Sequence, residues 1–191
     1  MQEELTMLTA QQIEKELGRI TYKKRYTQVM RSTIFILAVV AAVAILIATM
    51  FLPVLNVYGT SMTPTFEDGD IVVCIKKSDF EAGELVAFYY NNKILVKRVI
   101  ATSGQWVDID DEGNVTVDGE LLDEPYLEQK ALGECNIEFP YQVPDGRYFV
   151  MGDNRSISAD SRIEEIGCIS QEEIVGEIIF RVFPFNSFGL V

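Results

Sequence analysis

The feature that most restricts the fold of this chain is a long uncharged stretch near its N-terminus. No charged residue occurs between Arg31 and Glu67, and residues 34–57 are almost wholly apolar. At about 1.5 Å per residue, roughly 20 helical residues suffice to cross a bilayer. A helix buried in a globular core would be shorter and would show a polar face. We therefore predict a transmembrane helix over residues 32–57, which anchors the chain in a lipid bilayer.

A cleavable signal peptide is the main alternative for this stretch. The tripeptide Ala42-Val43-Ala44 has the small-x-small pattern of a cleavage site and follows a short apolar run. The apolar run continues well beyond Ala44, however. This continuation favours a retained anchor over a leader that is removed.

Basic residues cluster before the predicted helix and indicate its orientation. Residues 1–56 hold six basic and four acidic side chains, whereas residues 57–191 hold ten basic and 25 acidic ones. Positively charged flanks remain on the cytoplasmic side of a membrane. We expect a single-pass protein of the cell membrane, with a cytoplasmic tail over residues 1–31 and an extracytoplasmic domain over residues 58–191.

Composition excludes several classes of function. The chain has no histidine, so neither a Ser-His-Asp triad nor a histidine-ligated metal site is available. Its three cysteines show no CxxC pair and are too few for an all-cysteine zinc site. The acidic distal part is expected to repel nucleic acid. We therefore expect no metal, no cofactor and no nucleic-acid partner.

Beyond the apolar run, the hydrophobic pattern breaks into short segments bounded by Gly, Asn and Asp turns. The two-residue link Asn91-Asn92 tolerates positive φ and is suited to closing a hairpin. One short helical stretch is predicted, at residues 171–174. The fold class is therefore mainly β, an antiparallel β-sheet domain anchored by one N-terminal transmembrane helix. The predicted strands span residues 71–75, 85–90, 93–100, 106–109, 115–117, 148–151 and 174–183.

Two side chains in this domain can form a catalytic pair without histidine. Ser61 follows the anchor in a loop that Gly59 allows to turn tightly. Lys97 lies in a predicted strand, where alternation places it beside Leu95 and Val99 on an apolar face. Desolvation lowers the pKa of a lysine, and a neutral amine is able to accept a proton from a serine hydroxyl. Taken separately, a loop serine and a strand lysine are both common structural features.

A third motif packs polar residues densely behind the strand at residues 148–151. The segment from Gly152 to Arg162 reads Gly-Asp-Asn-Arg-Ser-Ile-Ser-Ala-Asp-Ser-Arg. Asp160 and Arg162 carry opposite charges and are able to pair, which would leave a serine hydroxyl free to orient a neighbouring amine. Such a density of charged and hydroxyl groups indicates an ordered polar network.

These three pieces, in this order and after an anchor, resemble the characteristic boxes of bacterial type I signal peptidases. The resemblance covers roughly residues 34–183, and the third box carries most of its specificity. It implies a serine endopeptidase that removes signal peptides from exported preproteins by cutting after small-x-small sites such as Ala-x-Ala. By the same resemblance, the peptide adds to the enzyme as a strand.

The resemblance also implies a role for each matching residue. Ser61 is implied as the nucleophile and Lys97 as the general base, with Ser158 positioning the lysine amine. Three charged residues are implied as structural supports of the site, namely Asp153, Asp160 and Arg162. The positions that match substrate-pocket residues are Tyr58, Met62, Phe66, Leu95 and Val96.

Two other functions remain open at this point. A self-cleaving Ser-Lys repressor would need a DNA-binding domain where the apolar run lies. A membrane-tethered, catalytically inactive binding module is the second alternative, since Gly59 stands where some family members have an oxyanion-stabilising serine. We also consider a disulfide between Cys135 and Cys168, because both lie in the part expected outside the membrane.

Overall fold

The computed structural model describes residues 10–191, and the side chains of all of these except residues 10, 11 and 49–51. The chain divides into two compact units, residues 1–48 and residues 49–191. The predicted cytoplasmic tail lies partly outside the described residues, because its first nine residues are not among them. Its remaining residues belong to the helix described next.

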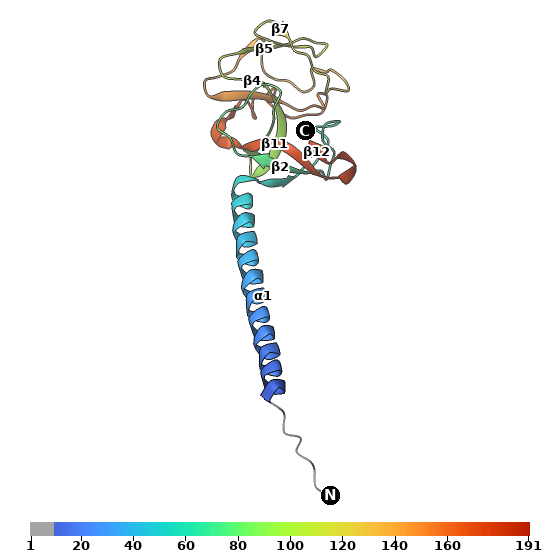
Figure 1. Ribbon diagram of the computed structural model, residues 1–191. Helices are drawn as coiled ribbons and strands as arrows, with labels where there is room; N and C mark the ends of the chain where they lie inside the picture. Colours follow the sequence, from blue (N-terminus) through green and yellow to red (C-terminus); the bar gives the residue numbers. More distant parts are fainter. Residues whose placement is uncertain (1–9) are drawn as a thin grey trace. The chain divides into compact units, whose positions relative to one another are not determined.

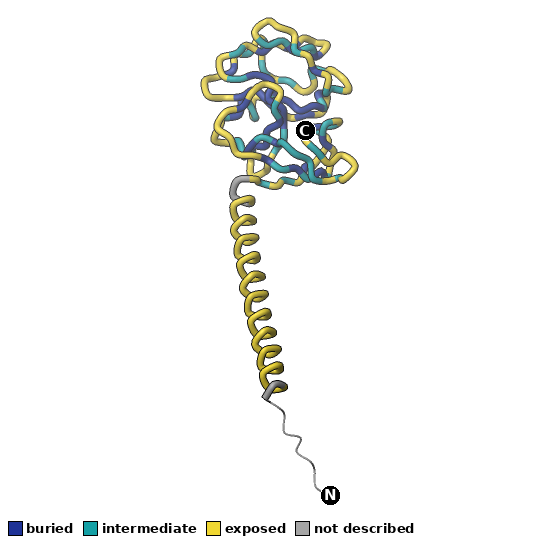
Figure 2. Tube along the Cα trace, in the orientation of Figure 1, coloured by how far each residue is buried: buried dark blue, intermediate teal, exposed yellow. Residues whose placement is uncertain are grey.

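From residue 10 on, the first unit is one long helix, α1 (Ala10–Phe51), whose last residues are counted with the second unit (Figure 1). Its side chains are exposed along the described length, as Figure 2 shows. By length and composition, the part from Gln12 to Ala48 is able to cross a membrane, with a mean hydropathy of 2.5 in its most apolar window. The charge-free part that starts at residue 32 is 20 residues long as helix, or roughly 30 Å, which matches the hydrocarbon core of a bilayer.

The predicted C-terminal end of this helix, residue 57, is wrong. The helix ends at Phe51, and Val54–Asn56 form a strand, β1, in the second unit. Pro53 accounts for the difference, because proline has no amide proton to donate and disfavours the helical conformation of the residue before it. The apolar residues Val54 and Leu55 are therefore part of a sheet and not of the helix.

The second unit is built on antiparallel strands, as predicted. Its larger sheet has eight strands within the described residues, in the order β1-β2-β11-β3-β4-β9-β10, with β12 paired to β11. All of its pairings are antiparallel. The strands after β1 are β2 (Ile71–Ile75), β3 (Leu85–Tyr90), β4 (Lys93–Ala101), β9 (Arg147–Met151), β10 (Ile169–Ser170), β11 (Ile174–Phe183) and β12 (Gly189–Leu190).

One edge of strand β4 is paired over only part of its length. Its whole length up to Arg98 pairs with β3, whereas β9 pairs with it only from Arg98 to Ala101. Residues 93–97 therefore have a free edge on the β9 side. Among the described residues, strand β1 pairs with β2 alone, so its other edge is free there as well.

A smaller sheet follows β4 in the chain and shares a core with the larger one. Its strands lie in the order β7-β6-β5-β8. Buried residues of both sheets form one cluster, in which Phe149 and Met151 pack with Val107, Ile109 and Val115. The four strands are β5 (Trp106–Ile109), β6 (Val115–Val117), β7 (Glu120–Leu121) and β8 (Tyr141–Gln142).

Local predictions in this domain have mixed outcomes. Asn91 and Asn92 close the β3–β4 hairpin with φ values of 46° and 61°, which confirms the predicted turn. The predicted helix at residues 171–174 is instead a single 3₁₀ turn, η1 (Gln171–Glu173). A second such turn, η2 (Phe185–Ser187), precedes β12. The side-chain alternation along β4 changes near its end, where a register shift places Ala101 in the cluster that also holds Ile100.

The predicted disulfide between Cys135 and Cys168 is wrong, because all three cysteines are free thiols. Cys168 is buried in the core cluster that joins the two sheets, and burial raises its pKa to about 11. The half-buried Cys135 instead donates its thiol to the carbonyl of Ile137. Cys168 is therefore packed in the core and does not pair with Cys135, although both were expected outside the membrane.

Candidate active site

Ser61 lies in a loop whose ends are hydrogen bonded to each other and in which Met62 and Phe66 are buried. The Val57 amide donates to the Asp70 carbonyl at 2.8 Å, and the Gly69 amide donates back to Val57 at 2.9 Å. Between these ends Met62 is buried in the core with only 1% of its surface exposed. Gly59 has a φ of 84°, a conformation that side-chain-bearing residues rarely adopt. The loop therefore presents Ser61 on a backbone that is held from both sides.

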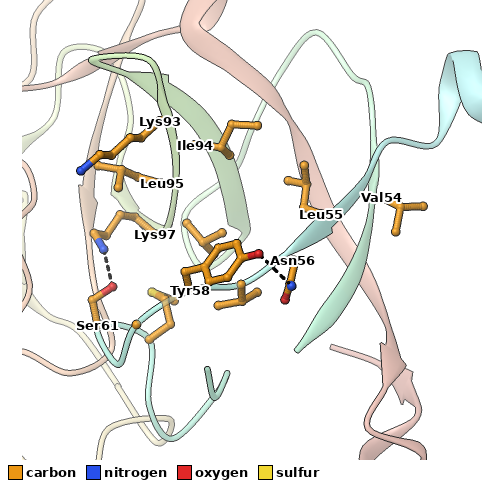
Figure 3. A pocket seen from close by; sticks show the side chains of 13 residues that line it. Val54, Leu55, Asn56, Tyr58, Ser61, Lys93, Ile94, Leu95 and Lys97 are labelled. Atoms are coloured by element: carbon orange, nitrogen blue, oxygen red, sulfur yellow. Dashed lines mark hydrogen bonds between the residues drawn. The ribbon is translucent and has the colours of Figure 1, made fainter. Parts of the chain in front are cut away.

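Lys97 lies on β4 opposite Val86 of β3 and is 2% exposed. Its Nζ atom is hydrogen bonded to Ser61 Oγ at 2.7 Å, as the dashed line in Figure 3 shows. Burial lowers the pKa of the Lys97 amine from its ordinary value of 10.5 to about 8. Asp160 and Asp153 raise this pKa and Arg162 lowers it, but each by less than burial does. The predicted serine and lysine thus meet at hydrogen-bond distance, and the pKa of the lysine amine, about 8, lies below its ordinary value of 10.5.

Asp153 connects the third motif to both sides of the pair. Arg98, the residue after Lys97, donates to the Asp153 carboxylate through Nε at 2.9 Å and through Nη2 at 2.6 Å. Thr65 of the serine loop donates to the same carboxylate. The Asn154 amide also donates to the Ser61 carbonyl at 3.0 Å. The Asp153 segment therefore connects the serine loop with the lysine strand, and its role as a support of catalysis stays a prediction.

Asp160 and Arg162 form a fully buried ion pair, with two hydrogen bonds of 2.8 Å between them. The second Asp160 oxygen also accepts the Gly152 amide at 2.9 Å. Arg162 donates further to three carbonyls, those of Leu132, Arg155 and Ser158. The ion pair between Asp160 and Arg162 that the sequence suggested is therefore formed. Its hydrogen bonds connect both ends of the segment from Gly152 to Arg162.

Ser158 lies in the site, but its predicted hydrogen bond to Lys97 is not formed. Its hydroxyl is buried and has no hydrogen-bond partner among the described residues. It lies so close to Gly152 that a Cβ atom there would overlap its Oγ, and the same Cβ would come within 2.5 Å of the Ser61 carbonyl oxygen. Glycine at position 152 thus allows Ser158 and the serine loop to approach each other, and the positioning role of Ser158 stays a prediction.

An apolar cavity of about 630 Å³ opens beside the serine and lysine. It is lined by β1, by the loop that follows it and by residues 93–97 of β4, so the two free strand edges face the same space (Figure 3). Four of the five predicted pocket residues line it, namely Tyr58, Met62, Leu95 and Val96. Tyr58 is 78% exposed, and its hydroxyl accepts the Asn56 amide at 3.1 Å.

Phe66 does not line this cavity, contrary to the prediction. It is fully buried, and the Arg181 guanidinium lies over its ring at 4.9 Å. The Phe66 amide donates to the Met62 carbonyl, which turns its side chain into the core below the loop. Phe66 therefore supports the loop that carries Ser61 and does not contact the cavity.

Sequence reasoning missed a second layer of charged residues behind the site. Arg155 and Glu124 form an ion pair in which both side chains are completely buried. Tyr126 donates to Glu124 and places its ring 3.9 Å from the Arg98 guanidinium. Arg155 belongs to the recognised motif, but nothing in the local sequence around Glu124 and Tyr126 indicates their partners.

Comparison with known proteins identifies the family. The family model "Signal peptidase, peptidase S26" matches residues 29–183. Signal peptidase I of Bacillus licheniformis is 39% identical over 164 residues, which are 79% of this chain and 86% of that protein. Signal peptidase IB of Staphylococcus aureus (strain COL) is 33% identical over 173 residues, which are 80% of this chain and 88% of that protein.

A solved structure is similar over part of the chain. The crystal structure of a signal peptidase I from Enterococcus faecalis V583 is 27% identical, with a TM-score of 0.42. The match covers 52% of this chain and 96% of that one.

By these comparisons the chain is a peptidase, and therefore a hydrolase. More narrowly, the chain belongs to the type I signal peptidase family, peptidase S26.

Proposed function

We propose that this chain is a membrane-anchored signal peptidase in which Ser61 attacks the scissile carbonyl and Lys97 acts as general base. The observation that carries the proposal is the 2.7 Å contact between Lys97 Nζ and Ser61 Oγ, in a chain without histidine. The neutral amine takes the hydroxyl proton as Ser61 Oγ bonds to the carbonyl carbon. The resulting ammonium then protonates the leaving amine, and a water molecule hydrolyses the acyl-enzyme by the same route.

The substrate is proposed to bind as an extended strand between the two free edges that face the cavity. Residues 93–97 of β4 and strand β1 offer unpaired backbone groups there, and strand addition satisfies such groups. Beyond Arg98 the edge of β4 is occupied by β9, so the residues before the cut run from Lys97 toward Lys93. The Ser61 amide is proposed to stabilise the oxyanion, because Gly59 has no hydroxyl to contribute.

The proposed membrane arrangement is supported by the charges around α1. Its charge-free part spans the bilayer, the basic residues before it stay cytoplasmic, and residues 58–191 lie outside. Asp153, Asp160, Arg162 and Ser158 are proposed to hold the catalytic pair in place. The inactive binding module is the less favoured function. A buried lysine that contacts a serine and has a lowered pKa is more typical of a catalytic site than of a purely structural role.

Cleavage of a preprotein tests this function. The full chain in detergent micelles is expected to cut a preprotein after an Ala-x-Ala site, releasing the leader. Replacing the alanine before the cut by phenylalanine is expected to lower kcat/KM about 10- to 100-fold, because a bulky side chain overpacks a pocket shaped for a small one. Mass spectrometry of the products locates the cut. Equal cleavage of both substrates would contradict the proposed specificity, and no cleavage of either would favour the binding module.

The pH dependence of the reaction tests the base. Because catalysis needs neutral Lys97, kcat/KM is expected to rise with pH through about 8, the lowered pKa of that amine. Two pH units below this value the rate is expected to be about 100-fold lower than on the plateau. Circular dichroism at each pH separates this titration from unfolding. An acidic limb centred near pH 4 to 5 in folded protein would indicate a carboxylate base instead.

A further inference from the structure

The cavity beside the catalytic pair has a second lysine at its far end. Lys93 and Lys97 both line it, and no acidic residue is among the described residues that do so. Figure 3 shows the Lys93, Leu95 and Lys97 side chains on the same side of β4, with Ile94 on the other side. The rest of the lining is apolar or uncharged. A peptide that lies along this part of β4 therefore passes two lysine side chains, of which only Lys97 contacts the catalytic serine.

Lys93 is available to a ligand. Its side chain is exposed, and within the described part of the chain it has no ion-pair partner. Most other charges of this domain are negative, with 25 acidic and ten basic side chains over residues 57–191. In such a domain, an unpaired lysine that lines a cavity without acidic residues makes the electrostatic potential there more positive than around the rest of the domain.

Strand geometry determines which substrate residue lies opposite Lys93. Lys93, Leu95 and Lys97 alternate with their neighbours, and the two lysines are four residues or about 13 Å apart along β4. In a paired strand, residues directly opposite each other point to the same face. If the residue before the cut lies at Lys97, the third residue before it lies at Leu95 and the fifth lies at Lys93.

We infer that Lys93 is a specificity-determining residue that favours an acidic side chain at the fifth position before the cleaved bond. This inference rests on the proposed function, since it needs the peptide to lie along β4 in the stated direction. The exposed Lys93 ammonium pairs with the substrate carboxylate beside the cavity. The interaction lies at an exposed site, so it modulates the choice among substrates and is not required for cleavage.

A set of three soluble peptides tests the inference. Each has alanine at the first and third positions before the cut, and they carry Glu, Gln or Lys at the fifth. For the full chain in neutral detergent we expect kcat/KM to fall from Glu to Gln to Lys, by about threefold per step, as for exposed ion pairs. Raising the salt from 0.1 M to 1 M shortens the Debye length from about 10 Å to about 3 Å and is expected to remove most of the difference.

Charge reversal makes the test specific to this residue. Lys93→Glu is expected to invert the order, so that the Lys peptide is cut faster than the Glu peptide. Lys76→Glu is the matched control, because Lys76 is also exposed but does not line the cavity, and it is expected to leave the order unchanged. An unchanged order in Lys93→Glu would overturn the inference. A Lys93-dependent preference at another position, found by moving the glutamate along the peptide, would overturn the assigned register.

The failure of this inference is distinguishable from the failure of the proposed function. If the wild-type chain cuts all three peptides at the same rate, the Lys93 assignment fails and the signal peptidase function stands. If it cuts none of them and no preprotein either, the proposed function fails. Neutral detergent without anionic lipid excludes the case in which Lys93 acts through a lipid headgroup.

Discussion

Ser61→Ala and Lys97→Met are each expected to lower kcat/KM on an Ala-x-Ala substrate by about 1000-fold or more. Removal of the hydroxyl removes the nucleophile, and removal of the amine leaves a serine with no base, a function that alone contributes about 100- to 10,000-fold. No histidine is available to take over. Initial rates on a soluble leader peptide measure the loss. Near-wild-type activity in either folded variant would contradict the assigned pair.

Matched variants show that the loss is specific to the pair. Ser78→Ala and Lys76→Met change exposed residues of the same types outside the cavity and are expected to retain activity. Lys97→Met is also expected to fold, because it removes an amine whose charged form is destabilised by burial on folding. The difference between a pKa of about 8 in the folded chain and 10.5 in the unfolded chain corresponds to about 3 kcal/mol at pH 7.

The sign of this stability effect is also testable. Between pH 8 and 10.5 the unfolded lysine binds more protons than the buried one, so the stability of the wild type rises with pH in that window. Lys97→Met lacks this titration. It is expected to unfold at a higher temperature than the wild type at pH 7, with the difference shrinking as the pH approaches 10.5. A lower Tm at pH 7 would mean that the amine stabilises the fold.

The second large effect is expected from Arg162→Leu. This change leaves the Asp160 carboxylate buried without its partner and removes the donors to three carbonyl groups. Breaking one side of a buried ion pair costs about 3–5 kcal/mol. Thermal unfolding of the full chain in detergent, followed by circular dichroism, measures the loss. Lys77→Met is the control, because its ion pairs with Glu84 and Glu177 are partly exposed and are expected to contribute less than about 1 kcal/mol.

A double variant separates the charge from the packing. Adding Asp160→Asn to Arg162→Leu removes the unpaired charge and is expected to restore part of the lost stability. The pH limb gives a second readout, since Arg162 lowers and Asp160 raises the pKa of Lys97. The Arg162 variant should therefore shift the limb to higher pH, and Asp160→Asn alone should shift it to lower pH. Additive stability losses in the double variant would contradict a coupled pair.

The sequence by itself was sufficient for the features that depend on local pattern. About 20 consecutive apolar residues are typical of a helix that crosses a bilayer, so the exposed helix was predictable. Alternating apolar residues and turn residues identified most strands, and Asn91-Asn92 identified the hairpin because few residues tolerate positive φ. The family resemblance gave Ser61 and Lys97, which lie 36 positions apart in the chain and yet meet at 2.7 Å.

Only the tertiary structure decided which groups share a buried environment. Phe66 and the cysteines were misjudged because an apolar loop residue can face a pocket or the core, and a thiol can pair or pack, with the same local sequence. Glu124 and Tyr126 contact the site arginines across 28 or more positions, and no local periodicity encodes such a contact. The lowered pKa of Lys97 has the same origin, since desolvation depends on every element packed around the amine.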